Sequence, residues 1–149
     1  MSRLEQLYQD TVLVHNKNPK NFKEVDYPTH VAHGKNPLCG DDYWLYLKIE
    51  DNRIVDLGFQ GSGCAISKSS ASLMTQTALG KTPDEILALK DHFIDLLTQD
   101  PSPEAARTGV GSLKIFETVK NYPVRVKCAT LIWRALEKAL TTGGEISTE

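Results

Sequence analysis

The sequence predicts an α+β fold, in which helices pack on one face of a small antiparallel sheet. Residues 43–60 carry the alternating pattern of a strand hairpin, and from Cys64 onward apolar residues recur at helical spacing. Strands that come first and helices that follow are typical of an α+β arrangement. A chain of 149 residues has room for one sizeable core, so we expect residues 1–149 to form a single domain.

The first part of the chain predicts one helix and three strands. Apolar residues at helical spacing between Leu4 and Val12 predict a short amphipathic helix before residue 16. The polar segment 16–28 contains two prolines and predicts a loop, after which a short strand is expected within residues 29–33. Two longer strands, Tyr43–Glu50 and Arg53–Gln60, are joined by residues 51–52, and so short a turn predicts an antiparallel hairpin.

The rest of the chain predicts helices. Small side chains dominate residues 64–79, and Gly80 is a suitable helix stop. Residues 82–85 read Thr-Pro-Asp-Glu, which predicts a helix start because a threonine cap, an early proline and acidic side chains all suit a helix N-terminus. The prolines at 101 and 103 end that helix, and further helices are expected at residues 111–120 and 124–140.

Charge and hydropathy argue against two classes of partner. The 17 basic and 19 acidic residues give a formal net charge of -2, whereas nonspecific nucleic-acid binding needs a basic excess. The longest apolar run covers only residues 43–47, far short of the roughly 20 residues that span a membrane. The first residues carry no secretory signal, so we expect a cytoplasmic protein whose thiols stay reduced.

Three cysteines and one aspartate are the candidate functional residues. The count is small and odd, which excludes a disulfide framework as the main stabiliser. Cys39 lies in a turn between Pro37 and Gly40, and Asp41 follows two residues later. Cys64 lies at the predicted junction of a strand and a helix, where the helix N-terminus favours the thiolate. Cys128 follows Arg125 and Lys127 in the first turn of the predicted last helix.

Three thiolates and a carboxylate suit a metal, but the spacing leaves alternatives open. They would form a closed four-coordinate Zn²⁺ site or an incomplete set for an iron–sulfur cluster. Such a set carries four negative charges, and the nearby Arg125 and Lys127 are expected to offset them and to favour the thiolate of Cys128. No CxxC pair is present, and each cysteine taken alone is equally consistent with a buried core residue.

Three segments resemble the iron–sulfur cluster assembly proteins of the IscU/NifU N-terminal type. They read Asn-Pro-Leu-Cys-Gly-Asp at 36–41, Gly-Phe-Gln-Gly-Ser-Gly-Cys-Ala-Ile-Ser at 58–67 and Pro-Val-Arg-Val-Lys-Cys at 123–128. The resemblance covers nearly the whole chain and implies an α+β fold with a three-stranded antiparallel sheet packed against helices.

The sequence differs from the scaffold branch of that family in two features, and both features resemble those of its SufU branch. Lys127 takes the place of a histidine before the third cysteine, and 63 residues separate Cys64 from Cys128. The SufU resemblance implies Zn²⁺ held by Cys39, Asp41, Cys64 and Cys128. It also implies sulfur supplied by a pyridoxal-phosphate cysteine desulfurase, and downstream cluster-assembly or apo-acceptor proteins.

The sequence therefore leaves three alternative hypotheses for the function. The first is a zinc-containing sulfur acceptor, with Cys39 as the catalytic cysteine because it lies on a loop rather than on a helix. The second is a scaffold on which a [2Fe–2S] cluster is assembled and then transferred to apo-proteins. The third is a binding module with a purely structural zinc, which an aspartate beside three cysteines makes the least expected.

Overall fold

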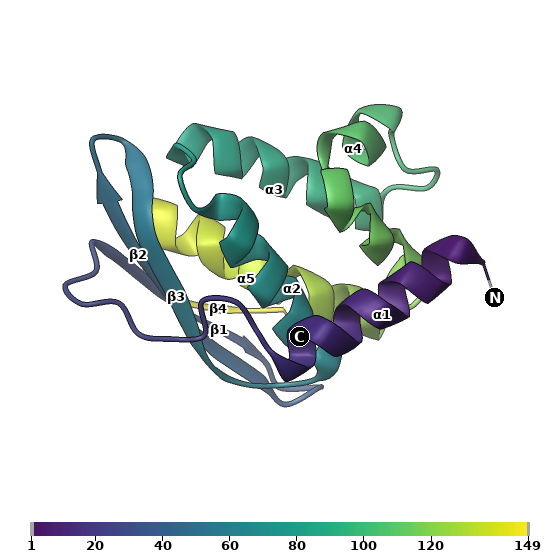
Figure 1. Ribbon diagram of the computed structural model, residues 1–149, viewed down its shortest axis with the longest axis horizontal. Coiled ribbons are helices and arrows are strands. Elements are labelled where there is room, and N and C mark those ends of the chain that lie inside the picture. The colour runs from purple at the N-terminus through teal and green to yellow at the C-terminus, as the bar shows by residue number, and fades with distance from the viewer. Residues whose placement is uncertain (1, 149) are drawn as a thin grey trace.

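The computed structural model describes residues 2–148 (Figure 1). Strands and helices follow one another in the order α1, β1, β2, β3, α2, α3, α4, η1, α5, β4. Their bounds are α1 Arg3–Lys17, β1 His30–Asn36, β2 Asp41–Glu50, β3 Arg53–Ser62, α2 Ala65–Ala78, α3 Pro83–Thr98, α4 Glu104–Gly109, the 3₁₀ helix η1 Gly111–Val119, α5 Pro123–Thr141 and β4 Gly144–Ser147.

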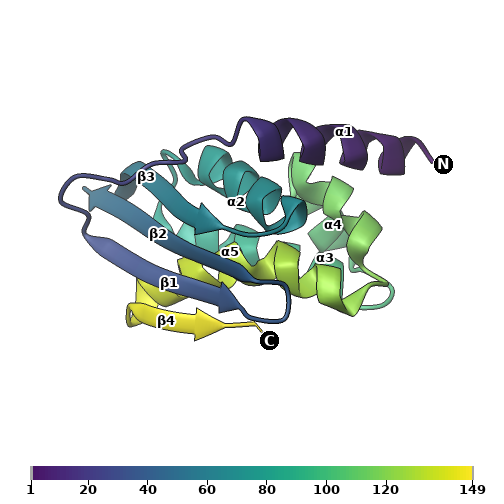
Figure 2. The same ribbon diagram turned by 90° about the horizontal axis from the view of Figure 1, so that it is seen from below.

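The sheet has the strand order β3-β2-β1-β4, and Figure 2 shows β4 at its outer edge beside β1. The pairs β1–β2 and β2–β3 are antiparallel, whereas β4 pairs with β1 in parallel. Helices α2 and α5 contact the sheet and separate it from α3 (Figure 1). The predicted α+β class is confirmed, but the sheet has four strands and is mixed, not three-stranded and antiparallel.

The missed elements are short and weakly patterned. Strand β4 has four residues, of which only Ile146 is a large apolar residue, and it follows Gly143-Gly144, so its sequence reads as a tail beyond the last helix. Helix α4 has six residues and no side-chain cap. The segment predicted as a helix at residues 111–120 is a 3₁₀ helix. In each case tertiary packing, rather than local pattern, sets the conformation.

The predicted hairpin is confirmed. Tyr43, Leu45 and Leu47 alternate along β2 with their side chains fully buried against the helices. On the opposite face Trp44 is 44% exposed and stacks on His33 of β1. The period of two along β2 therefore separates an inner face that builds the core from an outer face at the surface.

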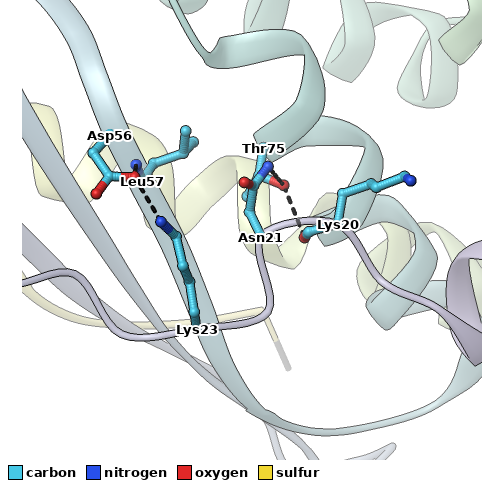
Figure 3. A network of polar contacts seen from close by, with 6 residues as sticks. All are labelled: Lys20, Asn21, Lys23, Asp56, Leu57 and Thr75. Atoms are coloured by element: carbon cyan, nitrogen blue, oxygen red, sulfur yellow. Dashed lines mark hydrogen bonds and ion pairs between the residues drawn. The ribbon is translucent and has the colours of Figure 1, made fainter.

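The loop at residues 18–29 is fastened to α2 and β3 (Figure 3). Asn21 Nδ2 donates to Thr75 Oγ1 at 3.2 Å, and that hydroxyl donates to the Lys20 carbonyl at 3.2 Å. Lys23 pairs with Asp56 at 2.9 Å. The Phe59 amide donates to the Asn21 carbonyl, so this loop covers part of the outer edge of β3.

Buried hydrogen bonds join α2 to α5. The buried Ser70 hydroxyl donates to the Ala129 carbonyl at 2.6 Å and accepts the Trp133 indole N–H at 3.2 Å. The ends of these helices that carry Cys64 and Cys128 are therefore held side by side.

Within residues 2–148, no helix combines the length and the apolar character that a membrane span requires.

Candidate metal centre

The β1–β2 turn holds Cys39 and Asp41. The Cys39 amide donates to the Asn36 carbonyl at 3.1 Å, and Gly40 adopts a φ of 72°, which favours glycine. Asn36 and Asp41 face each other as the last paired residues of the two strands. Cys39 is half-buried at the turn, whereas the side chain of Asp41 points inward and is only 2% exposed.

The N-terminus of α2 positions Cys64. This cysteine is the N-cap of the helix, and its sulfur accepts the Ser67 amide at 3.4 Å. Its own amide donates to Asp41 Oδ1 at 2.9 Å, which ties the start of α2 to the β1–β2 turn. The prediction that Cys64 lies at a strand-to-helix junction with its sulfur at the helix N-terminus is confirmed.

Cys128 joins the two parts of the site. It is buried in the second turn of α5, where the Asn36 amide group donates to its sulfur at 3.7 Å. The metal-binding atoms of Cys39, Asp41 and Cys128 all lie within 4.8 Å of one another. Cys64 is outside that group, and it reaches the site through its amide, which donates to Asp41 Oδ1. The fold thus brings together all four residues that the sequence singles out.

The two linked thiols differ in acidity. A hydrogen bond from the Cys128 thiol lowers the pKa of Cys64 to about 6, although burial opposes this shift. The same hydrogen bond, together with burial, raises the pKa of Cys128 far above its ordinary value. The expectation that Arg125 and Lys127 favour the thiolate of Cys128 is therefore wrong for the protein alone, because the neighbouring sulfur and burial favour its protonated form.

Asp41 presents one oxygen toward the cysteines without a partner. Oδ1 accepts the Cys64 amide at 2.9 Å and the Ser67 hydroxyl at 3.0 Å. Oδ2 is buried and has no hydrogen-bond partner within residues 2–148. A buried carboxylate oxygen without a partner is costly unless a cation satisfies it. Together with the sulfurs of Cys39 and Cys128, this oxygen fits a metal ion.

Close packing behind Asp41 depends on Gly63. A Cβ atom at this position would lie 2.5 Å from Asp41 Oδ1 and 2.7 Å from the hydroxyl oxygens of Ser67 and Tyr43. The Tyr43 hydroxyl lies 3.0 Å from Ser67 Oγ, and burial raises the pKa of Tyr43, so its phenol stays protonated. Any side chain at residue 63 would separate these polar groups from the carboxylate.

The supporting residues are those that sequence reasoning missed. Sequence reasoning did not single out four of them: Ser67, Tyr43, Gly63 and Asn36. Ser67 nevertheless stands three residues after Cys64, which is the spacing that links an N-cap to its partner.

Within residues 2–148, the two basic residues expected to offset the charge of the site form no ion pair with Asp41. The Arg125 guanidinium lies over the Tyr122 ring at 4.6 Å, and among the described residues neither it nor Lys127 forms an ion pair with Asp41.

The fold and the grouped cysteines and aspartate define a cluster-assembly type of domain, and the chain belongs to the family described as NifU-like N terminal domain, whose profile matches residues 7–129. One relative is the zinc-dependent sulfurtransferase SufU of Bacillus subtilis, 36% identical over 93% of this chain and 92% of its own. Another is the iron-sulfur cluster assembly scaffold protein IscU of Streptococcus pyogenes, 36% identical over 94% of this chain and 86% of its own.

Solved structures agree with this assignment. A crystal structure of a putative iron-sulfur cluster assembly scaffold protein for the SUF system of Fervidobacterium islandicum superposes with a TM-score of 0.83 and 34% identity, over 92% of this chain and 98% of that one. The N-terminal part of a NifU-like protein from Brucella abortus gives a TM-score of 0.78 at 27% identity, over 93% of this chain and 95% of that one. The resemblance stated from three short segments is confirmed.

Proposed function

We propose that this chain is a zinc-containing sulfur acceptor in iron–sulfur cluster assembly. It would take persulfide sulfur from a pyridoxal-phosphate cysteine desulfurase in the cytoplasm and pass it on to downstream cluster-assembly or apo-acceptor proteins. Cys39, Asp41, Cys64 and Cys128 would hold the zinc. The observation that carries the proposal is the unpartnered Oδ2 of Asp41 beside the converging sulfurs.

The donor set favours zinc. Three sulfurs and one carboxylate oxygen match the four-coordinate tetrahedral geometry that Zn²⁺ prefers. The amino group of a protonated lysine has no lone pair, so Lys127 cannot act as a further ligand in the way a histidine would. When bound, zinc would keep the coordinated sulfurs deprotonated at neutral pH.

Cys39 is the proposed sulfur acceptor because its sulfur is the least restrained of the three. Cys128 is 3% exposed, and the Cys64 sulfur accepts an amide at the start of α2. Cys39 is half-buried on a turn beside Leu38, which is 66% exposed. A partner can therefore reach this turn without unfolding either helix.

The transfer step exchanges one sulfur–sulfur bond for another. The Cys39 thiolate attacks the outer sulfur of the desulfurase persulfide, a new S–S bond forms on Cys39, and the desulfurase cysteine leaves as a thiolate. The outer sulfur keeps its oxidation state, so the step needs no external oxidant or reductant. The product is a Cys39 persulfide and a desulfurase ready for another turnover.

Assembly of a [2Fe–2S] cluster on the same cysteines is the second candidate function. It is favoured by the relatives from Streptococcus pyogenes and Thermotoga maritima, which are both named cluster assembly scaffolds and are 36% identical to this chain. Three cysteines and an aspartate would then hold the cluster in place of zinc.

Metal analysis combined with a desulfurase assay separates the two functions. The protein as purified is analysed for zinc and iron, and desulfurase turnover is measured with and without it. About one zinc per chain with strong stimulation supports the sulfur acceptor. Iron with no stimulation, followed by anaerobic cluster formation and transfer to an apo-protein, supports the scaffold and contradicts the acceptor.

Substitution Cys39→Ala tests the acceptor residue. We expect it to abolish desulfurase stimulation, because the attacking thiolate is missing, and mass spectrometry should find no persulfide on the 36–41 segment. Asp41→Asn is the matched variant, since it perturbs the same metal centre but retains the Cys39 thiol and should still accumulate some persulfide there. Full stimulation by Cys39→Ala protein would contradict the assignment.

A further inference from the structure

Asn36 is a fully buried polar residue beside the candidate metal ligands. It is the last residue of β1, in which residues 32, 34 and 36 form the buried face that packs against α5. Its carbonyl accepts the Cys39 amide at 3.1 Å, so the turn fixes the backbone at this point. The strand and the turn therefore set the place of the Asn36 side chain.

Stability does not account for an asparagine at this position. Nδ2 donates to the Cys128 sulfur at 3.7 Å, but Oδ1 is buried and has no hydrogen-bond partner within residues 2–148. A buried amide oxygen without a partner is costly, and an apolar side chain of the same shape would avoid that cost. An asparagine that is retained in such a place points to a function for its other group, the Nδ2–H donor.

The three candidate sulfur ligands differ in the donors that reach them. Asn36 donates to the sulfur of Cys128, and the Ser67 amide donates to the sulfur of Cys64 at 3.4 Å. In the part of the chain that the structure describes, residues 2–148, no N–H or O–H group donates to the sulfur of Cys39. The only one of the three without such a donor is thus the proposed sulfur acceptor.

A hydrogen bond to a metal-bound thiolate changes what the sulfur can do. The donor stabilises the negative charge on the sulfur, so the thiolate stays ionised and attacks another sulfur less readily. Asn36 and Cys128 are both buried, so water does not compete for their hydrogen bond, and the low local dielectric strengthens it. The Cys39 sulfur has no such restraint.

We propose that Asn36 is a positioning residue that keeps the Cys128 thiolate on the metal while Cys39 leaves it to accept sulfur. This role depends on the proposed function. Cys64 and Cys128, each with a donor to its sulfur, would remain bound together with Asp41 during the transfer. Asn36 would thus help to decide which of the three cysteines reacts.

Zinc affinity in Cys39→Ala protein tests the proposal, because this substitution reproduces the state in which Cys39 has left the metal. Two further substitutions each remove the Nδ2 donor: Asn36→Ala leaves a void, whereas Asn36→Leu fills the space with apolar atoms. Combined with Cys39→Ala, each should weaken zinc binding about 10- to 100-fold relative to Cys39→Ala alone. Competition with a chelating dye measures the affinity, and circular dichroism verifies that each variant is folded.

Ser70→Ala in the same background is the matched control. Ser70 is fully buried, and its hydroxyl donates at 2.6 Å to the carbonyl of Ala129, the residue after Cys128, without contacting a sulfur. It should leave zinc affinity unchanged. Unchanged affinity in both Asn36 variants would overturn the proposal. An equal loss in the Ser70→Ala control would also overturn it, because the effect would then come from loosened packing between α2 and α5.

The absorption of the cobalt-substituted protein gives a readout that a purely structural role would not move. Co²⁺ bound by sulfurs shows sulfur-to-metal charge-transfer absorption, and a hydrogen bond to a coordinated sulfur raises the energy of this transition because it stabilises the sulfur electrons. In protein that retains Cys39, Asn36→Ala and Asn36→Leu should each shift the band to longer wavelength, and Ser70→Ala should not. An unshifted band in both Asn36 variants would overturn the proposal even if their zinc affinity fell.

Failure of this role can be told apart from failure of the proposed function. Neither measurement needs a desulfurase, so a protein that stimulates none can still show the effect of Asn36 on the metal. A protein that accepts sulfur, but whose zinc affinity and cobalt spectrum do not depend on Asn36, contradicts only the positioning role. A protein that binds neither zinc nor cobalt contradicts both.

Discussion

The contacts of Asp41 show how neighbouring groups orient the carboxylate of a candidate metal ligand. Its Oδ1 is occupied by the Cys64 amide and by Ser67, so the carboxylate cannot rotate freely, and Oδ2 is left for a cation. The Tyr43 hydroxyl in turn contacts Ser67 at 3.0 Å. Such partners typically influence metal affinity nearly as strongly as some ligands do.

Removal of the Ser67 hydroxyl tests this role at the residue scale. Ser67→Ala should lower zinc affinity about 10- to 100-fold, because Asp41 loses the contact that orients it. Competition with a chelating dye measures the change. Ser112→Ala, at an exposed position on η1, is the control and should leave zinc affinity unchanged. Unchanged affinity in Ser67→Ala protein would show that the hydroxyl has no positioning role.

At the scale of elements, α1 is attached to α2 through a histidine. His15 Nδ1 lies 2.7 Å from the buried Ser72 hydroxyl, which also accepts the Lys20 amide at 2.7 Å. Burial, with Lys20 nearby, lowers the pKa of His15 below its ordinary value near 6.5. The neutral ring is therefore the form that the packed helices favour.

Acidification should weaken this attachment. Because the pKa of His15 is lower in the folded state, the unfolded chain binds more protons, and stability rises with pH. The His15 contribution is full above about pH 6.5 and is lost as the pH falls through the folded-state pKa. Urea unfolding from pH 5 to 8 should show a flatter pH dependence in His15→Gln protein. His30→Gln, on β1, is the control, and an unaltered slope in His15→Gln would refute the expectation.

At the scale of the whole molecule, the core extends well beyond the metal centre. The Phe93 ring stacks on Trp133 at a centroid distance of 4.9 Å and meets Phe116 edge-on at 5.8 Å, and all three are fully buried. These residues lie on α3, α5 and η1. A core of this extent supports the fold without a metal.

Removal of the metal by a chelator should therefore lower the melting temperature without unfolding the chain. A ligand that binds only the folded state adds about 4 kcal/mol at a thousandfold excess over its Kd, and chelation removes that contribution. Far-ultraviolet circular dichroism and the fluorescence of the buried Trp133 should remain those of a folded protein at 25 °C. Loss of both signals on chelation would instead indicate the purely structural zinc.

Elements with strong local signals were predictable. The Thr82 cap forms as expected and is part of a capping box with Glu85, and the 51–52 turn joins two antiparallel strands. β4 was not predictable, because four residues with one large apolar side chain give no period. Its strand conformation depends on pairing with β1, which β4 reaches only after α5 has crossed the sheet.

The sequence by itself determined which residues are the candidates for the chemistry. Cys39, Asp41, Cys64 and Cys128 stand at element ends, and local signals such as turns, caps and helix starts are enough to place them there. Only the tertiary structure decided that these ends meet and that Ser67 occupies one oxygen of Asp41. The physical reason is separation along the chain: Asn36 and Cys128 touch across 92 positions, and no local pattern encodes a contact that arises from packing of the sheet on α2 and α5.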